Sequence, residues 1–286
     1  MLPKRQAKNL KRNTNINNKH FDELARELQA DLDARRERRV FADRRGPKSI
    51  EEAYKLQRAL RAFRESRGET VIGFKIGYTS AAVRKNNAEI MGLSESVHGY
   101  LWDSESYKDG DAINYRRLAI EGELGVQLIS THGDDVSQWE VEFQPIIEIH
   151  MFGMDGPAED NRGRRGLELI GTNCIHAGVV HCPKTKRCLV GEIPLSTPMN
   201  LSIGGLKKEQ VTLTELEIEN LYGPIATISW LLRTLRAEGN GEEKMLKPGS
   251  SLICSTPGGL YPVSPGEEVR VEFAGLETIC TATRQE

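Results

Sequence analysis

The chain has 286 residues and a formal net charge of −2, which argues against an electrostatic attraction to nucleic acid or to an anionic membrane. Hydrophobic residues make up 38% of the chain and aromatic residues only 6%, so we expect an aliphatic core. No apolar run approaches the roughly 20 residues that span a bilayer, and the N-terminus lacks the apolar segment of a signal peptide. The five cysteines then favour free thiols in a reducing compartment, and we expect a cytoplasmic protein.

The N-terminal end of the chain is strongly basic. The first 20 residues, "MLPKRQAKNLKRNTNINNKH", contain six Lys or Arg, no acidic residue and no apolar periodicity. This composition is typical of a solvated, disordered tail, which we assign to residues 1–18. A nucleic-acid-binding arm and a targeting signal are the alternatives.

Residues 19–69 are predicted to form a helical segment. Its first helix has apolar residues at helical spacing between Phe21 and Leu32. A second helix follows Ser49, which together with Glu52 forms a capping-box pattern, and Gly68 is a natural C-terminal stop.

The sequence pattern changes at Val71, where helical periodicity ends and short β-branched runs separated by glycines begin. One later stretch is helical, with Pro224 at its start and Gly239 at its end. We expect strands at 70–77, 118–130, 142–152, 176–181, 250–255 and 268–274. The order of these elements predicts an α+β fold in which residues 70–286 form one domain.

The stretch "AIEGELGVQL" carries two glutamates in a mostly apolar run. Because side chains alternate between the two faces of a strand, Glu121 and Glu123 lie on the same face. On the residues alone, a solvated outer face is the common interpretation of such a pair. A cation held between the two carboxylates is the other interpretation.

A third glutamate favours the cation. Glu148 lies in "FQPIIEIHMFG", within the most apolar predicted strand, where an unpaired carboxylate would cost several kcal/mol. Three carboxylates at one point would repel each other unless a divalent cation neutralised them, and oxygen ligands favour Mg²⁺ or Mn²⁺ over Zn²⁺. Periodicity alone does not establish that the three side chains converge.

The stretch "TVIGFKIGYTS" places Lys75 on a strand between two glycines of the same face, Gly73 and Gly77. Glycines at these positions leave room for a ligand to approach the amine closely. The alternative is an edge strand whose lysine extends its amine into solvent.

Eight segments of the chain together resemble one enzyme family, the 2-oxopent-4-enoate hydratases and 4-oxalocrotonate decarboxylases, which have the fumarylacetoacetate hydrolase-like fold. The resemblance extends from about Leu24 to Leu276, and it depends on the order of the segments rather than on a single motif. The segments are "SIEEAYKLQ", "GFKIGYTS", "HGYLWD", "IEGELGVQL", "PIIEIH", "GTN", "ISWLLRTL" and "STPGGLYPVSPGEEVRVEFAGL".

The resemblance implies a mixed β-sandwich or β-roll domain preceded by a helical segment. It implies a metal-dependent lyase of meta-cleavage aromatic catabolism that hydrates or decarboxylates an unsaturated 2-oxo acid or its 2-hydroxydienoate form. The implied cofactor is Mg²⁺ or Mn²⁺, held by Glu121, Glu123 and Glu148, and Lys75 is the implied catalytic amine. The implied substrate-binding residues are Gly77, Thr79, Asn173 and Ser255. The implied assembly is a homo-oligomer, with a complex with a paralogous hydratase or decarboxylase as a further possibility.

Several positions depart from the family pattern. The acid expected before "GYL" is replaced by Val97-His98, the usual Thr-Gly is Cys254-Ser255, and the segment before the late helix reads Tyr222-Gly223-Pro224. An imidazole can relay protons near neutral pH, so we take His98 as a second catalytic candidate. A glutamate as the third metal ligand is similar to the hydratase and decarboxylase branch, whereas the C–C hydrolases have aspartate.

Three alternatives stay open. An acylpyruvate-type C–C hydrolase would need a water-activating dyad for which the sequence has no clear counterpart. A catalytically weak family member acting as a partner subunit is compatible with the altered positions. The segment "CIHAGVVHCPKTKRC" could suggest zinc, but its spacing matches no common zinc motif, and His98, His150 and His176 are individually typical structural residues.

Overall fold

The computed structural model describes residues 4–114, 118–151, 153, 155, 163–213, 223–255 and 258–283, with the backbone alone at 4–18, 82 and 255. The chain divides into two compact units. The helical unit comprises Met1–Glu69, Glu89–Gly92 and Met154–Asn173, and the sheet unit comprises Thr70–Ala88, Leu93–Gly153 and Cys174–Glu286. A division near residue 70 was expected from the sequence, whereas the two later insertions into the helical unit were not.

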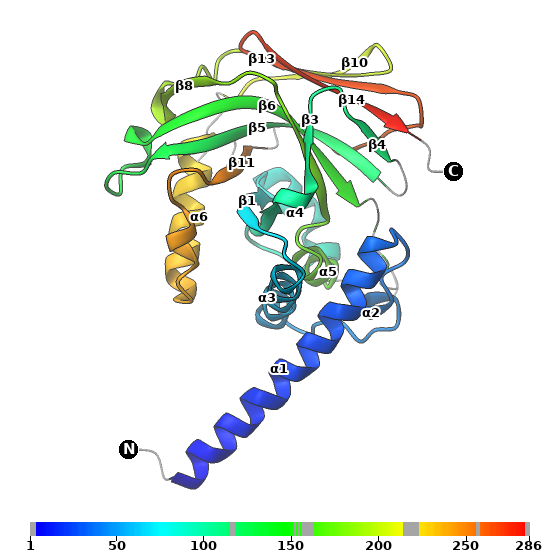
Figure 1. Ribbon diagram of the computed structural model, residues 1–286, viewed down its shortest axis with the longest axis vertical. Helices are drawn as coiled ribbons and strands as arrows, with labels where there is room; N and C mark the ends of the chain where they lie inside the picture. The colour runs from blue at the N-terminus through cyan, green and yellow to red at the C-terminus, as the bar shows by residue number, and fades with distance from the viewer. Residues whose placement is uncertain are drawn as a thin grey trace. The chain divides into compact units, whose positions relative to one another are not determined.

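The helical unit is built around one long helix (Figure 1). Its helices are α1 (Lys4–Asp33), α2 (Arg39–Ala42), α3 (Ile50–Ser66) and α5 (Arg165–Gly171). A buried cluster joins the first three, with Phe21, Leu24 and Leu28 of α1 packed against apolar residues of α2 and α3. Helix α1 begins at Lys4, so its backbone is helical through most of the segment that we expected to be disordered. That residues 1–18 are dispensable stays a prediction.

Helix α3 has the capping pattern that the sequence predicts. The backbone N–H of Glu52 donates to Ser49 Oγ over 3.2 Å, and the Glu52 carboxylate accepts from the backbone N–H of Lys48 over 2.7 Å. At the other end Gly68 takes a φ of +92°, a left-handed conformation that suits glycine. The helix expected between Ser49 and Gly68 is confirmed.

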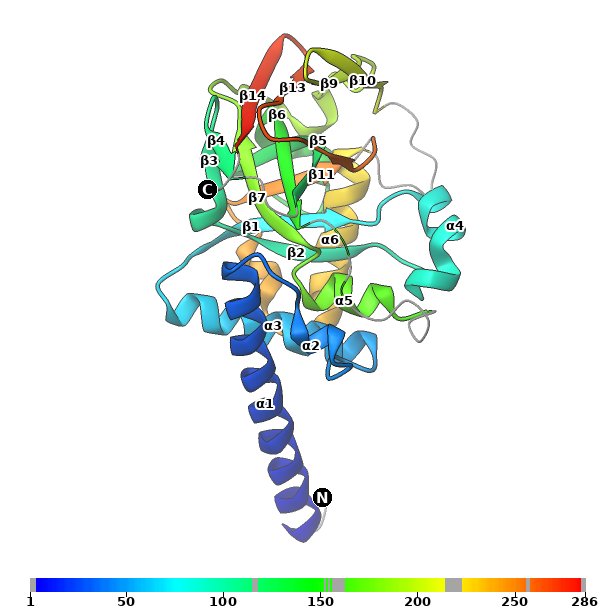
Figure 2. The ribbon, with the colours of Figure 1, turned by 90° about the vertical axis from the view of Figure 1, so that its right-hand side faces the viewer.

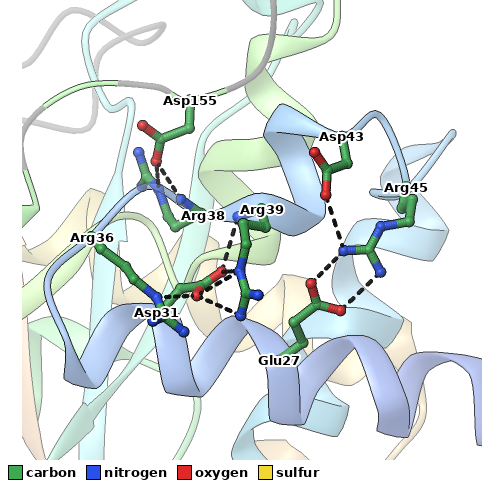
Figure 3. A network of polar contacts seen from close by, with 8 residues as sticks. All are labelled: Glu27, Asp31, Arg36, Arg38, Arg39, Asp43, Arg45 and Asp155. Atoms are coloured by element: carbon green, nitrogen blue, oxygen red, sulfur yellow. Dashed lines mark hydrogen bonds and ion pairs between the residues drawn. The ribbon is translucent and has the colours of Figure 1, made fainter.

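A network of ion pairs fixes the segment that leaves α1 (Figure 3). The buried carboxylate of Asp31 accepts from Arg36 Nε over 2.6 Å and from the backbone N–H of Arg39 over 2.9 Å. The fully buried Arg38 donates to Asp155 over 2.5 Å. The buried charges of this unit are thus paired, as low-dielectric surroundings require.

The sheet unit contains two sheets, seen edge-on in Figure 1 and turned by 90° in Figure 2. The order of the larger sheet is β2 (Val97–Trp102), β1 (Val71–Gly77), β11 (Ser251–Ser255), β5 (Leu118–Ser130), β6 (Glu140–Met151), β7 (His176–His181) and β3 (Ser106–Lys108). In addition, β12 (Tyr261–Pro262) pairs with β5, and β8 (Lys186–Leu189) pairs with β6. The order of the smaller sheet is β10 (Leu206–Val211), β9 (Met199–Ile203), β13 (Glu268–Phe273), β14 (Leu276–Thr283) and β4 (Ala112–Asn114).

Short helical elements complete the fold. Helix α6 (Pro224–Glu238) packs against β11, and helix α4 (Ala81–Met91) follows β1. Single 3₁₀ turns lie at Asp103–Glu105, Val136–Gln138, Val190–Glu192 and Glu242–Met245. Among the described helices, none combines the length and apolar character needed to cross a bilayer.

The two sheets pack face to face over a common apolar core. Ile147 and Ile149 of β6 lie in this core together with Val271 and Phe273 of β13. A Cβ added at Gly122 would lie 3.2 Å from Val271 Cγ2, so the glycine between the two glutamates permits this close sheet packing. The expected α+β sandwich with an N-terminal helical segment is confirmed, and the glutamates lie on the face opposite this core.

The expected strands correspond to β1, β5, β6, β7, β11 and β13, and the late helix corresponds to α6. Helix α6 begins with Pro224 in its first turn and ends at Gly239, whose φ is +65°. The sequence pattern does not predict the strands β2, β9, β10 and β14 or the helices α4 and α5.

Candidate metal centre

Strands β5 and β6 bring the three glutamates and one histidine together. Glu121 lies opposite Glu148 in the antiparallel register, and opposed residues share a face. One ligand atom from each of Glu121, Glu123, Glu148 and His150 lies within 4.8 Å of the others. Glu123 and Glu148 are buried, and the Glu121 side chain is 16% exposed. We call these four residues the carboxylate–histidine cluster.

Two further groups, Lys75 and His176, contact the Glu148 carboxylate. Lys75 of β1 donates from Nζ to Glu148 Oε1, and its Nζ also lies 3.5 Å from the carbonyl oxygen of Cys174. His176 of β7 places Nδ1 2.7 Å from the same Glu148 Oε1. The other carboxylate oxygen, Oε2, is buried without a hydrogen-bond partner. Glu148 is therefore anchored through one oxygen and keeps the second available.

Electrostatic attraction between Lys75 and Glu148 keeps both groups in their charged forms. Burial alone would raise the pKa of Glu148, but Lys75, His150 and His176 lower that pKa far below its ordinary value. Burial alone would lower the pKa of Lys75, but Glu148 and other nearby acidic groups raise it above its ordinary value. Both groups are therefore charged at neutral pH, and Lys75 is a poor proton acceptor while Glu148 remains beside it.

The charge and the donor atoms of the cluster fit a divalent cation. The three carboxylates and the Lys75 ammonium together carry a net charge of −2, which a divalent cation would balance. Carboxylate oxygens are ligands of Mg²⁺, Ca²⁺ and Mn²⁺, and an imidazole adds a nitrogen ligand. Glu148 Oε2 and His150 Nε2 are buried without hydrogen bonds, so they are donor atoms that a cation could use.

The two glycines beside Lys75 have different roles. A Cβ at Gly73 would lie 1.7 Å from the carbonyl oxygen of Ser251, so this glycine is required for the parallel pairing of β1 with β11. A Cβ at Gly77 would meet Val97 at 3.7 Å and Lys75 Cε at 3.9 Å, which are ordinary contacts. The expectation that both glycines clear space around the amine is therefore wrong for Gly73.

His98 is not part of the cluster. In the register of β1 and β2 it lies opposite Ile76, whereas Lys75 lies opposite Gly99, so the side chains of His98 and Lys75 extend from opposite faces. His98 Nε2 instead lies 3.0 Å from Glu238 of α6. The catalytic role that we expected for His98 finds no support in this placement.

The other predicted substrate-binding residues are placed as follows. Thr79 is buried just after β1, and its carbonyl oxygen accepts from Arg84 over 2.8 Å. Ser255 ends β11, and its side chain lies outside the described residues. Asn173 belongs to the helical unit and begins a run of three residues with positive φ that ends at Ile175. Substrate contacts of these residues and of Gly77 stay predictions.

The Cys/His-rich segment forms no zinc site among the residues described. Cys174 and Cys182 are buried free thiols, and Cys182 Sγ donates to the carbonyl oxygen of Glu277. Burial raises the pKa of Cys174 to about 12, although Lys75 opposes this shift. His176 contacts Glu148, and His181 lies 3.4 Å from Gln144. His150 lies in the cluster but was not a ligand candidate from the sequence, although period-two spacing places it beside Glu148.

Sequence comparison finds curated enzymes that are similar to most of the chain. A 2-keto-4-pentenoate hydratase of Paraburkholderia xenovorans (strain LB400) is 25% identical over 246 residues, covering 82% of this chain and 83% of the enzyme. A 4-oxalocrotonate decarboxylase of Pseudomonas sp. (strain CF600) is 24% identical over 237 residues, which cover 79% of this chain and 82% of the enzyme. No family model matches the chain.

Solved structures share the fold. The 4-oxalocrotonate decarboxylase of Pseudomonas putida G7, complexed with magnesium and adipate, has a TM-score of 0.74 at 19% identity and covers 92% of this chain and 97% of its own. A fumarylpyruvate hydrolase of Pseudomonas aeruginosa, in complex with Mn²⁺ and pyruvate, has a TM-score of 0.51 at 14% identity. The match covers 74% of this chain and 89% of the hydrolase chain. In sequence and in fold, this chain is thus similar over most of its length to the 2-oxopent-4-enoate hydratases and 4-oxalocrotonate decarboxylases of the fumarylacetoacetate hydrolase-like fold.

Proposed function

We propose that this protein is a divalent-metal-dependent lyase that hydrates or decarboxylates an unsaturated 2-oxo acid or its 2-hydroxydienoate form. The observation that carries the proposal is the carboxylate–histidine cluster, with the buried ammonium of Lys75 beside it. The curated enzymes that are similar in sequence include a hydratase and a decarboxylase, and both have an unsaturated 2-oxo acid in their names.

The glutamates would hold the cation, and Lys75 would act on the substrate. A divalent cation supplies Lewis acidity that stabilises negative charge developing on a 2-oxo acid. Lys75 is held by Glu148 with its charge intact, so it can attract a substrate carboxylate or stabilise negative charge that develops on the substrate. The resemblance adds Gly77, Thr79, Asn173 and Ser255 as candidates for substrate contacts.

Paired substrate assays on the metal-loaded protein test this function. Loss of the ultraviolet absorbance of 2-hydroxypenta-2,4-dienoate reports hydration, and CO₂ release from 4-oxalocrotonate reports decarboxylation. We expect turnover of one substrate that stops on chelation and returns with Mg²⁺ or Mn²⁺. Turnover of neither substrate, with metal bound, would leave the partner-subunit alternative as the better explanation.

A matched pair of variants tests whether metal binding and turnover depend on the cluster in particular or on any glutamate of β6. Glu148→Gln should abolish both turnover and the metal-dependent rise in melting temperature, because it removes a charged ligand. Glu142→Gln, on the same face of β6 but outside the cluster, should change neither. Equal behaviour of the two variants would contradict the site assignment.

We also infer a cytoplasmic homo-oligomer, with a complex with a paralogous lyase as a further candidate. The five free cysteines support a reducing compartment. Closed symmetric dimers are the commonest assembly among soluble enzymes. Light scattering on the purified protein, alone and mixed with a paralogous enzyme, measures both assemblies directly.

A further inference from the structure

His150 has the geometry of a metal ligand rather than of a packed core residue. It follows Glu148 by two positions in β6, so both side chains lie on the same face of the sheet. Its register partners are Ala119 on β5 and His176 on β7. Nε2 lies 2.9 Å from Glu121 Oε2 and 3.5 Å from Glu148 Oε2.

Neither ring nitrogen of His150 has a hydrogen-bond partner, although the residue is only 4% exposed. His150 Nε2 is therefore close to Glu121 Oε2, but the angle between them is not that of a hydrogen bond. Buried polar atoms without a partner are rare and each requires an explanation. Glu148 Oε2 is a second such atom and lies 3.5 Å from His150 Nε2. His150 Nε2 and Glu148 Oε2 are thus two buried atoms with free lone pairs that lie close to each other and to Glu121, an arrangement that suits a shared cation.

The geometry points to His150 as a fourth, nitrogen ligand of the cation that Glu121, Glu123 and Glu148 hold. We propose further that this ligand shifts the preference of the site from Mg²⁺ toward first-row transition-metal dications such as Mn²⁺ and Co²⁺. Oxygen-only sites suit Mg²⁺ and Ca²⁺, whereas imidazole favours transition metals, and Co²⁺ binds such ligands more tightly than Mn²⁺ does. This inference depends on the metal site of the proposed function, but not on the identity of the substrate.

Calorimetric titration of the metal-free protein with Mg²⁺, Mn²⁺ and Co²⁺ tests the preference. We expect Co²⁺ to bind more tightly than Mg²⁺, and His150→Leu to weaken Co²⁺ binding by roughly tenfold or more. Mg²⁺ binding by His150→Leu should change much less than Co²⁺ binding. His181→Leu is the matched control, because His181 lies opposite Ile146 on the same face of the sheet and is not among the four clustered residues.

Pulsed electron paramagnetic resonance of the Mn²⁺-loaded protein tests ligation directly. Protein labelled with ¹⁵N at histidine should show coupling of the manganese spin to an imidazole nitrogen, and this coupling should persist in His181→Leu. If His150→Leu does not fold, the more conservative His150→Gln should lose this coupling while His181→Leu keeps it.

The outcomes distinguish the two proposals. Metal binding without nitrogen coupling, or an equal loss of Mg²⁺ and Co²⁺ affinity in His150→Leu, would overturn the role of His150 and leave the proposed function intact. Absence of binding of any of the three cations would overturn the proposed function as well.

Discussion

Glu121 and Glu148 lie directly opposite each other across β5 and β6, with both side chains on the same face of the sheet. Like charges at opposed positions of a sheet destabilise it. Here the ammonium of Lys75 contacts Glu148 and offsets part of this repulsion. The stability of the sheet should therefore depend on positive charge at this point, whether it comes from Lys75 or from a bound cation.

Replacing the ammonium tests this dependence. Lys75→Met leaves the buried Glu148 without its ammonium partner, with only His176 and His150 beside it, so we expect the metal-free protein to lose about 3–5 kcal/mol of unfolding free energy. A saturating divalent cation should restore part of this loss. Urea unfolding with and without metal measures both effects, with Lys108→Met on the exposed strand β3 as a control that stays within about 0.5 kcal/mol of the wild type. An unchanged stability of metal-free Lys75→Met would contradict the interpretation.

The two glycines of β1 should respond differently to the same substitution. Gly73→Ala forces a methyl group against the carbonyl oxygen of Ser251, so we expect a loss of about 3 kcal/mol or more in unfolding free energy. Gly77→Ala makes only ordinary contacts and should fold normally. If Gly77 also contacts the substrate, its alanine variant should raise KM at unchanged stability. Equal melting temperatures for the two variants would refute the strand packing described for Gly73.

The helical unit should lose stability in acid through Asp31. Burial alone would raise the pKa of Asp31, but Arg39 and Arg36 lower it below the ordinary value of 3.8. A carboxyl group with a lowered pKa stabilises the fold above its unfolded pKa, and this contribution is lost as pH falls through the folded pKa. Asp31→Asn should therefore cost about 1–3 kcal/mol at neutral pH and progressively less below the ordinary pKa of the carboxyl group.

Unfolding curves of the wild type and Asp31→Asn across this acidic range measure the difference. Asp43→Asn is the control, because the side chain of Asp43 is 58% exposed and lies 3.5 Å from Arg45. A difference between wild type and Asp31→Asn that stays constant down to the lowest pH would show that the ionised carboxylate is not the stabilising species.

The first residues of α1 should be dispensable. The buried contacts described for α1 begin at Phe21, so a chain that starts at Asn18 retains all of them. We expect this truncated protein to unfold at the same urea concentration as the full chain and to bind metal with the same affinity. A lower midpoint or weaker metal binding would show that the basic segment contacts the rest of the molecule.

Period-two spacing was sufficient to place Glu121 beside Glu123 and His150 beside Glu148. It was not sufficient to join the two pairs, because the register between β5 and β6 depends on the whole length of both strands. His150 was consequently interpreted as structural. The face that His98 occupies depends in the same way on the pairing of β2 with β1, which no local pattern specifies.

The elements that the sequence does not predict lack the periodic alternation of polar and apolar residues that marks a strand or a helix. Strand β2 is buried at every position, so "VHGYLW" has no alternation of polar and apolar residues to mark it as a strand. Strand β10, "LKKEQV", is mostly exposed and polar. Helix α5, "RGLELIG", is short and contains two glycines, which weakens any helical pattern.

The strand order β1-β11-β5 has a consequence for how the protein is made. Strands β5 and β6 are joined by residues 131–139 and can pair as soon as both have been synthesised, which gathers the glutamates early. Strand β1 is synthesised before either of them, yet it joins their sheet only through β11, near the C-terminal end of the chain. Because β5 and β6 pair locally, we expect the carboxylates to come together before Lys75 is held beside Glu148. During that interval, dissolved cations are the available counter-charge for the hairpin.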